Sequence, residues 1–311
     1  MVSDAIIGII IQMGMVVLLC IGFTFTYQIE RFPNFAHIGF AVIGTAITFH
    51  MTKFVGLNPY LAWPVSATIC GFIGVFFYRV IVVPIKKKRD DPIAITIAFY
   101  ALSIVLETFV ALYGYWMVRV KHETTRGFAL KRYDFAAFDL PGVAIVTPIM
   151  CLTLVTLLFY VLTKTSFGLA IRAVSEKEDL AEVFGVNTGR IHAYSWFIVG
   201  ALAGLAGSII PLWTSVRGGF GEEMLISVMA GSIIGGLDSV YGAVIGGMLI
   251  TIFQKGLSFF LMNMERNGTP LLVSFSFLIR EFSKLVPIIF IFVILMLMPE
   301  GITEYIRRKR A

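Results

Sequence analysis

Hydrophobic residues in this chain gather into long unbroken runs rather than into the alternating pattern of half-buried strands. An α-helix rises 1.5 Å per residue, so about 20 apolar residues cross the hydrocarbon core of a bilayer. Runs of that length lie at 5–27, 34–54, 60–84, 93–116, 142–162 and 192–213. Further runs lie near 220–237, 240–262 and 284–299. The pattern predicts an all-α integral membrane protein, a polytopic helical bundle of about eight to nine spans.

The run at 220–237 differs from the others because it is short and interrupted by glycine. Interrupted apolar segments are typical of the discontinuous helices of transporters. This run is therefore the candidate for one broken or re-entrant element. We expect residues 1–311 to form a single transmembrane domain, which contains a cytoplasmic loop at 163–191 and an external loop at 117–141.

Composition supports a membrane protein and excludes a nucleic-acid partner. The chain is 58% hydrophobic and 14% charged, with a net charge of +6, whereas soluble domains are about 25% charged. Its basic residues cluster at the ends of apolar runs, which indicates topology rather than a nucleic-acid footprint. Cys20, Cys70 and Cys151 lie inside apolar runs without motif spacing, so we interpret them as buried small hydrophobic residues.

Basic clusters also predict the orientation. Clusters at 86–89, within 163–191 and at 307–310 fall on one side of the membrane if the first run starts outside, and short basic loops favour the cytoplasm. The C-terminus is then cytoplasmic. The loop at 117–141 carries five Lys and Arg residues, but long loops translocate largely regardless of charge. Four tryptophans lie near predicted span ends, where an aromatic belt would place them: Trp63, Trp116, Trp196 and Trp213.

A charged helix is predicted inside the cytoplasmic loop. Ser175 and Glu178 form an S-x-x-E capping box, which predicts a helix over 176–184 with Gly185 as its left-handed end. Its first turn carries Glu176, Glu178 and Asp179, and its apolar positions near one face are Ala173, Leu180, Ala181 and Phe184. A helix of roughly nine residues is too short to stand alone in water. We interpret it as a docking helix.

Catalytic motifs are missing from the sequence. It contains no GxxxxGK[ST] phosphate loop, no HExxH and no GxSxG, and its four histidines lack ligand spacing. We therefore expect no enzyme activity, no metal site and no cofactor bound by this chain. If the chain pumps a solute, the energy must come from outside it.

Candidate pathway residues are few. Glu107 lies in the middle of the fourth run, where an ionisable group either hydrogen-bonds a neighbouring helix or lies beside a water-filled path. Asn34 and His37 open the second run, and they either line the conduit or cap and pin that helix end. The segment with Gly235, Gly236 and Ser239 is either a site of close helix packing or a tight turn between broken helices that border the conduit.

Four segments, spread through most of the chain, resemble the permease subunits of ABC importers of the branched-chain amino acid and amide (urea-type) class. They are the stretch from Asn34 to Gly44, the stretch from Thr165 to Ala173 followed by Ala181 and Gly185-Val186, the run from Gly200 to Gly207, and Gly235 to Gly247 with Met298-Pro299-Glu300-Gly301. The second segment is similar to the family's loop that docks on the ATPase, and it is the most specific. Asp238 and Gln254-Lys255 depart from the family pattern, which leaves the substrate open.

The resemblance implies an importer of the vitamin B12 and ribose type (type II) in a prokaryotic cell membrane. Its partners would be two ATP-binding cassette subunits that use ATP and Mg²⁺, a second permease that is related or identical, and an extracytoplasmic binding protein. The ATPase-coupling residues would be Thr165, Gly168, Arg172, Ala173, Glu176, Glu178, Asp179, Leu180, Ala181, Phe184 and Gly185. A secondary transporter and a passive channel for a small polar solute are the alternatives.

Overall fold

The computed structural model describes residues 2–88, 91–121, 127–216, 220–266, 276–298 and 301. The elements up to the cytoplasmic loop are α1 (Val2–Glu30), α2 (Ala36–Lys53), α3 (Pro59–Phe77), the π-helix η1 (Tyr78–Val82), α4 (Val83–Lys88), α5 (Pro92–Lys121), the 3₁₀-helix η2 (Lys131–Tyr133), β1 (Ala136–Ala137), β2 (Leu140–Pro141) and α6 (Gly142–Lys164). They are followed by α7 (Ser166–Glu176), α8 (Glu178–Val183), α9 (Thr188–Trp213), α10 (Phe220–Gly235), α11 (Val240–Arg266) and α13 (Ser276–Leu297).

Each predicted apolar run is helical, which agrees with an integral membrane protein. Within the described ranges, six helical stretches are long and apolar enough to cross a membrane: Asp4–Glu30, Pro59–Lys88, Pro92–Lys121, Gly142–Lys164, Thr188–Trp213 and Val240–Phe260. Helix α10 has only 16 residues, and Leu285–Leu297 is a shorter apolar helix. The predicted eight to nine spans therefore exceed the six that length and composition support.

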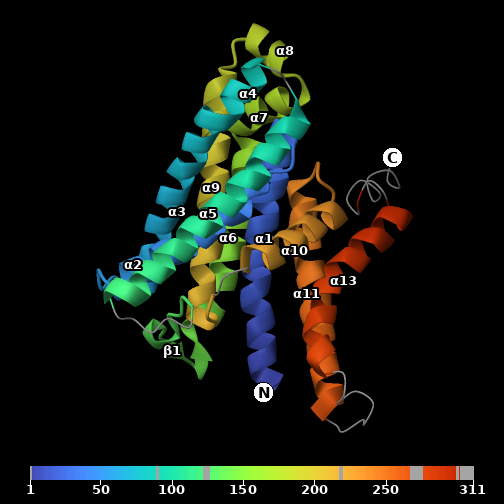
Figure 1. The fold of residues 1–311 in the computed structure, drawn as a ribbon. Helices are drawn as coiled ribbons and strands as arrows, with labels where there is room; N and C mark the ends of the chain where they lie inside the picture. The colour runs from blue at the N-terminus through green and yellow to red at the C-terminus, as the bar shows by residue number, and fades with distance from the viewer. Residues whose placement is uncertain are drawn as a thin grey trace.

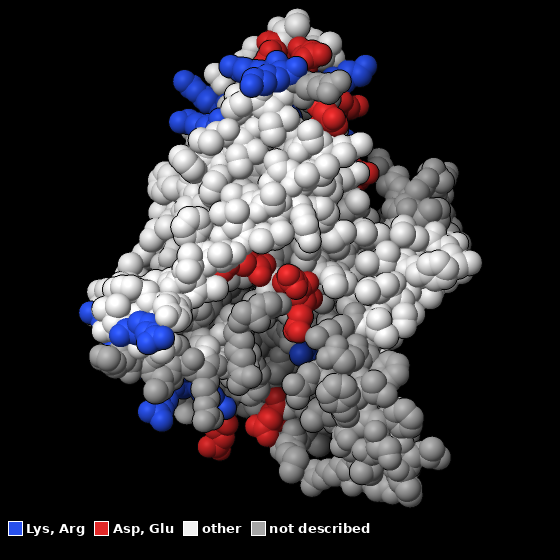
Figure 2. Space-filling model, viewed as in Figure 1, with Lys and Arg blue, Asp and Glu red and all other residues white. Residues whose placement is uncertain are grey.

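The helices form an elongated bundle around α1 and α9. Figure 1 shows α4, α7 and α8 at one end of the bundle and the β1–β2 hairpin at the other. Helix α9 packs against α1, α2 and α3, and α1 also packs against α11. Figure 2 shows charged side chains at the α7–α8 end, an uncharged band below them, and acidic side chains in a recess beneath that band.

Small residues bring these helices close together. Gly207 of α9 faces the backbone of α2, so a methyl group there would collide with the carbonyl oxygen of Ala41. Thr45 Oγ1 of α2 donates a hydrogen bond of 2.7 Å to the Gly207 carbonyl. The three cysteines are free and buried, as expected from their apolar surroundings.

A tight turn joins α10 and α11, as the glycine pattern predicted. Gly236 adopts φ +102, a left-handed conformation that favours glycine. Ser239 caps α11, because its Oγ accepts a hydrogen bond of 3.1 Å from the Gly242 amide. The two helices then run in close backbone contact, since a methyl group on Gly246 would collide with the Gly231 carbonyl oxygen.

Helix α5 continues to Lys121, past residue 116, the predicted end of the fourth apolar run. The prediction that all four tryptophans lie in an aromatic belt is wrong. Trp63 and Trp196 do not belong to a lipid-facing belt, because they are only 3% and 1% exposed. Trp63 Nε1 donates 3.1 Å to the Ser208 carbonyl, and burial with a partner for the indole N–H explains its position better than an interface does.

Candidate functional site: the α7–α8 region

Helix α7 begins with a cap that fastens it to the end of α6. Thr165 Oγ1 accepts a hydrogen bond of 3.3 Å from the Gly168 amide and donates one of 2.6 Å to the Val161 carbonyl. Gly168 lies so close to α6 that a methyl group there would collide with the Leu162 carbonyl oxygen. Both predicted coupling residues therefore set the angle at which the chain leaves the membrane bundle.

The predicted helix over 176–184 is wrong in its start and its cap. Ser175 lies inside α7, where its Oγ donates 3.0 Å to the Arg172 carbonyl. The chain breaks at Lys177, which is extended (φ −152, ψ 103), and α8 starts at Glu178. Burial of Ile171 and Val174 keeps the preceding turn helical, and this packing outcompetes the local capping signal. The predicted left-handed end is confirmed, because Gly185 has φ +82.

Helix α8 presents an apolar tip to solvent. Leu180, Val183 and Phe184 are 54%, 81% and 80% exposed, whereas Ala181 is buried at 4%. Arg172, Glu176 and Asp179 are also exposed, and Ala173 is half-buried. Three large apolar side chains at the end of a short helix form a surface that a partner protein can cover.

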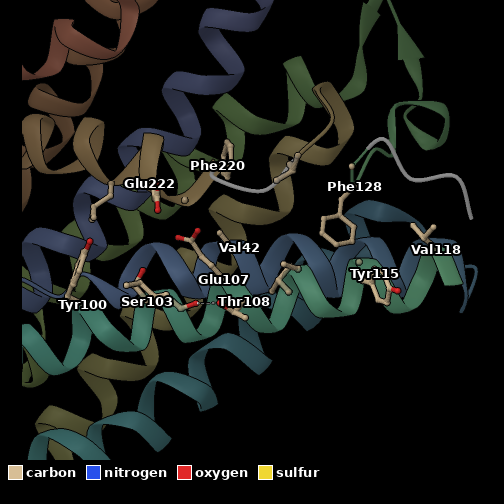
Figure 3. Close-up of a pocket in the computed structure, with 18 residues that line it drawn as sticks. Val42, Tyr100, Ser103, Glu107, Thr108, Tyr115, Val118, Phe128, Phe220 and Glu222 are labelled. Atoms are coloured by element: carbon tan, nitrogen blue, oxygen red, sulfur yellow. Dashed lines mark hydrogen bonds between the residues drawn. The ribbon is translucent and has the colours of Figure 1, made fainter. Parts of the chain in front are cut away.

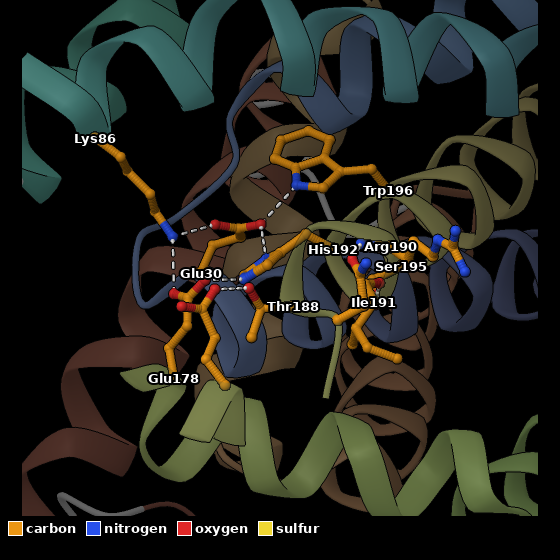
Figure 4. Close-up of polar contacts among 11 residues, drawn as sticks. Glu30, Lys86, Glu178, Thr188, Arg190, Ile191, His192, Ser195 and Trp196 are labelled. Carbon is orange, nitrogen blue, oxygen red and sulfur yellow. Dashed lines mark hydrogen bonds and ion pairs between the residues drawn. The ribbon is translucent and has the colours of Figure 1, made fainter. Parts of the chain in front are cut away.

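A cluster of charges, buried at Glu30 and His192 and half-exposed at Glu178, fixes α8 to three other helices (Figure 4). Glu178 Oε1 lies 2.9 Å from His192 Nε2, and His192 Nδ1 lies 2.7 Å from Glu30 Oε1. Trp196 Nε1 donates to the same Glu30 oxygen at 2.7 Å. Lys86 Nζ forms an ion pair with Glu30 Oε2 at 2.8 Å. The cluster therefore connects α8 to α9, to the end of α1 and to α4.

The geometry balances the charges in this cluster. Carboxylates accept hydrogen bonds only, so an imidazolium at His192 can donate to both Glu30 and Glu178. With Lys86, two cations then face two carboxylates. The hydrogen bond from His192 holds the pKa of Glu178 below its ordinary value of 4.5. The Tyr78 ring of η1 stacks on one face of the imidazole, with ring centroids 5.6 Å apart and an interplanar angle of 12°.

Arg31 links the same region to the α10–α11 turn. It follows α1 in a left-handed conformation (φ 58). Its Nη1 donates 2.8 Å to Asp238, and its Nη2 donates 3.0 Å to the Ser175 carbonyl at the end of α7. Asp238, which departs from the family pattern, thus has an ion-pair partner in this chain. Both side chains are exposed, at 54% for Arg31 and 73% for Asp238.

The residues predicted to border a conduit fall in three places. Asn34 and His37 are fully buried, and His37 Nε2 lies 3.1 Å from the Leu19 carbonyl, which pins α2 to α1. Glu107 lines a cavity beside α5. Ser239 lines a separate cavity at the α7 end, and Gly235 and Gly236 form the adjacent turn. A role of these residues in translocation stays a prediction.

The sequence interpretation missed the residues that anchor α8. In the sequence, Lys86 indicates only topology, Trp196 indicates only a membrane interface, and His192 shows no ligand spacing. The available signal is Glu30, an acid at the end of the first apolar run, because a lone carboxylate at a span end needs a partner from another helix.

A bundle of helices that are long and apolar enough to cross a membrane defines the class of multi-pass membrane proteins. The family described as the branched-chain amino acid transport system / permease component matches residues 5–295. The chain belongs to this family. It is therefore a multi-pass transport permease, because the family consists of permeases rather than ATPases, and family membership implies ATP-binding and substrate-binding components as partners.

Individual relatives agree with this membership. The chain is 31% identical over 296 residues to a probable branched-chain amino acid transport permease protein LivH of Methanocaldococcus jannaschii, covering 95% of this chain and 90% of the relative. It is 24% identical over 309 residues to the high-affinity system permease LivH of Escherichia coli, covering 92% and 90%. It is 25% identical over 252 residues to BraD of Pseudomonas aeruginosa, covering 76% and 80%. No solved structure matches the chain.

Proposed function

We propose that this chain forms half of the translocation path of an ATP-driven importer for branched-chain amino acids or related small amino acids and amides. The relatives named above are branched-chain amino acid permeases, which favours this substrate class. Two ATP-binding cassette subunits bind the α7–α8 end, a second permease completes the path, and an extracytoplasmic protein delivers the substrate. ATP and Mg²⁺ are used by the partner subunits.

The single observation that carries the coupling role is the apolar tip of α8 on a buried charged anchor. Leu180 and Phe184 offer the exposed contact, and Glu178 transfers its displacement to His192 and Glu30. A helix held in this way moves as a rigid body with α1, α4 and α9. Closure of the ATPases would then tilt these helices and change access to the path.

The orientation proposed here puts the α7–α8 end in the cytoplasm. Gly301 lies against Gly236, so the chain reaches this end just before its basic C-terminal segment, which positive-inside bias keeps cytoplasmic. Helix α10 begins beside Glu107, near the middle of α5, because Gly221 touches that carboxyl group. We count it as the broken element among about nine passes, in a type II importer arrangement.

The test is a pull-down in detergent with this chain as bait, compared with the Phe184→Asp variant. We expect ATP-binding subunits to copurify with the wild type and to be lost from Phe184→Asp, because a charge on the apolar tip must be desolvated in the interface. Leu180→Asp should have the same effect. The same preparations in liposomes should show ATP-dependent leucine uptake only where the ATP-binding subunits are retained.

Phe138→Asp is the matched control. Phe138 is 94% exposed and lies between β1 and β2, in the hairpin that Figure 1 shows at the opposite end of the bundle. It has φ 54, which Asp tolerates. The control should retain the ATP-binding subunits. Retention of these subunits by Phe184→Asp, or solute flux by the chain alone without ATP, would contradict the proposed function.

A further inference from the structure

A cavity of about 860 Å³ lies between α5, α2 and the start of α10. Along α5 its lining extends from Tyr100 to Val118, a distance of about 27 Å at 1.5 Å per residue. Its outer end is bounded by Phe128 and Val216, which pair with each other near the β-hairpin end. The cavity is therefore a cleft that runs from the predicted outer side toward the centre of the bundle.

Every charged side chain among the described lining residues is acidic. Glu107 of α5 and Glu222 of α10 both line the cavity, and Figure 3 shows their carboxyl groups directed toward one region of it. Gly221 leaves the space that the Glu107 carboxyl group occupies, since a methyl group there would collide with that carboxyl group. The backbone of α10 thus holds Glu107 against one wall of the cavity.

The remainder of the lining is suited to an amphipathic ligand. Tyr100, Tyr115 and Phe220 supply aromatic rings, and such rings attract ammonium groups through their faces. Val42 and Leu225 supply aliphatic surface. The volume lies in the range of about 300–1,000 Å³ typical of small-molecule sites.

Glu223, the acid next to Glu222 in the sequence, has a different environment. It lines a smaller cavity of about 160 Å³ together with Lys255. Glu223 thus shares its cavity with a lysine, whereas Glu107 and Glu222 share theirs with no basic side chain among the described lining residues. A charged carboxyl group in the middle of a membrane span is too costly to face lipid, so it faces protein, a water-filled path or a ligand.

We propose that this cavity binds the ammonium group of the transported amino acid between Glu107 and Glu222, with the aliphatic side chain against Val42 and Leu225. This inference rests on the proposed function and names the recognition site within it. The permease then selects for a primary ammonium group independently of the binding protein. An aliphatic carboxylic acid without the ammonium group is excluded by the two acids.

The experiment uses the purified transporter complex without its binding protein, so that only the permease selects the ligand. Equilibrium dialysis is performed with radiolabelled L-leucine, with 3-methylbutylamine, which lacks the carboxyl group, and with 4-methylpentanoate, which lacks the ammonium group. We expect leucine and the amine to bind and the acid not to bind. Glu107→Gln and Glu222→Gln should each weaken binding of leucine and the amine at least tenfold.

Asp139→Asn is the matched control, because Asp139 is an exposed acid at the β-hairpin end with φ 59, a conformation that Asn adopts readily. It should leave binding unchanged. Gly221→Ala keeps both acids but displaces the Glu107 carboxyl group, and it should also weaken binding. Size-exclusion profiles and copurified ATP-binding subunits show that each variant is assembled.

The outcomes separate the two proposals. If assembled wild type transports leucine with ATP, but Glu107→Gln and Glu222→Gln bind leucine and the amine as tightly as wild type, the ammonium site is wrong and the importer stands. Equal binding of 4-methylpentanoate and the amine would likewise overturn the site. Absence of ATP-dependent leucine transport by the wild-type complex in liposomes supplied with its binding protein would refute the proposed function itself.

Discussion

Replacement of Glu30 by glutamine tests the charged cluster at its centre. The Glu30 side chain is 1% exposed, and its Oε1 accepts from His192 Nδ1 and Trp196 Nε1 at 2.7 Å each. Glutamine preserves this acceptor. However, its amide NH₂ replaces the Oε2 that faces Lys86 Nζ at 2.8 Å, so a donor then faces an ammonium group and the buried pair is broken.

The size of the effect follows from the burial of the partners. Breaking a buried ion pair costs about 3–5 kcal/mol. We expect a cost at the lower end of this range, because the Lys86 side chain is 26% exposed and can turn toward water. With an unfolding entropy of about 2.1 cal/mol/K per residue, a loss of about 3 kcal/mol in a chain of 311 residues lowers the Tm by about 5 °C. Thermal unfolding of the purified chain in detergent, followed by intrinsic tryptophan fluorescence, measures this shift.

Two further variants isolate the cause. Glu176→Gln removes an equally charged but exposed carboxylate from α7 and should leave the Tm unchanged. The double variant Glu30→Gln/Lys86→Met should be less destabilised than the sum of its single variants, by about 0.5–3 kcal/mol. A Tm of Glu30→Gln within about 1 °C of wild type, or strictly additive losses, would refute the ion pair as a source of stability.

Two other predictions concern packing and pH. Gly207→Val places a side chain against the Ala41 carbonyl and should destabilise the protein by about 1–3 kcal/mol or prevent folding. Gly256→Ala, whose added methyl group meets no atom within 4 Å, should leave stability unchanged or raise it by up to about 1 kcal/mol. Equal monodisperse yields of both variants would contradict this prediction. The pKa of Glu178 lies below 4.5 because of His192, so its stabilising contribution is present above pH 4.5 and is lost as the pH falls through the lowered pKa. Tm values measured from pH 6 to pH 3 should therefore fall more in wild type than in Glu178→Gln, and parallel curves would count against the assignment.

Part of the α7–α8 region was predictable from neighbouring residues alone. Thr165 can cap the helix that follows it, and Gly185 can supply a left-handed end, because both effects involve groups within a few residues of each other. The box formed by Ser175 and Glu178 is equally local, yet it did not form. Burial of Ile171 and Val174 extends α7 beyond Ser175, and local patterns carry no information about that packing.

The sequence by itself determined the membrane class, the positions of the apolar helices and the small residues at which they approach. These follow from hydrophobicity and side-chain size along one stretch of chain. Only the tertiary structure decided that Glu30 meets His192, 162 positions away, and that Glu107 meets the start of α10. The physical reason is that a buried charge needs a partner but does not specify it. Helix packing selects that partner from all the charges that the fold brings within reach.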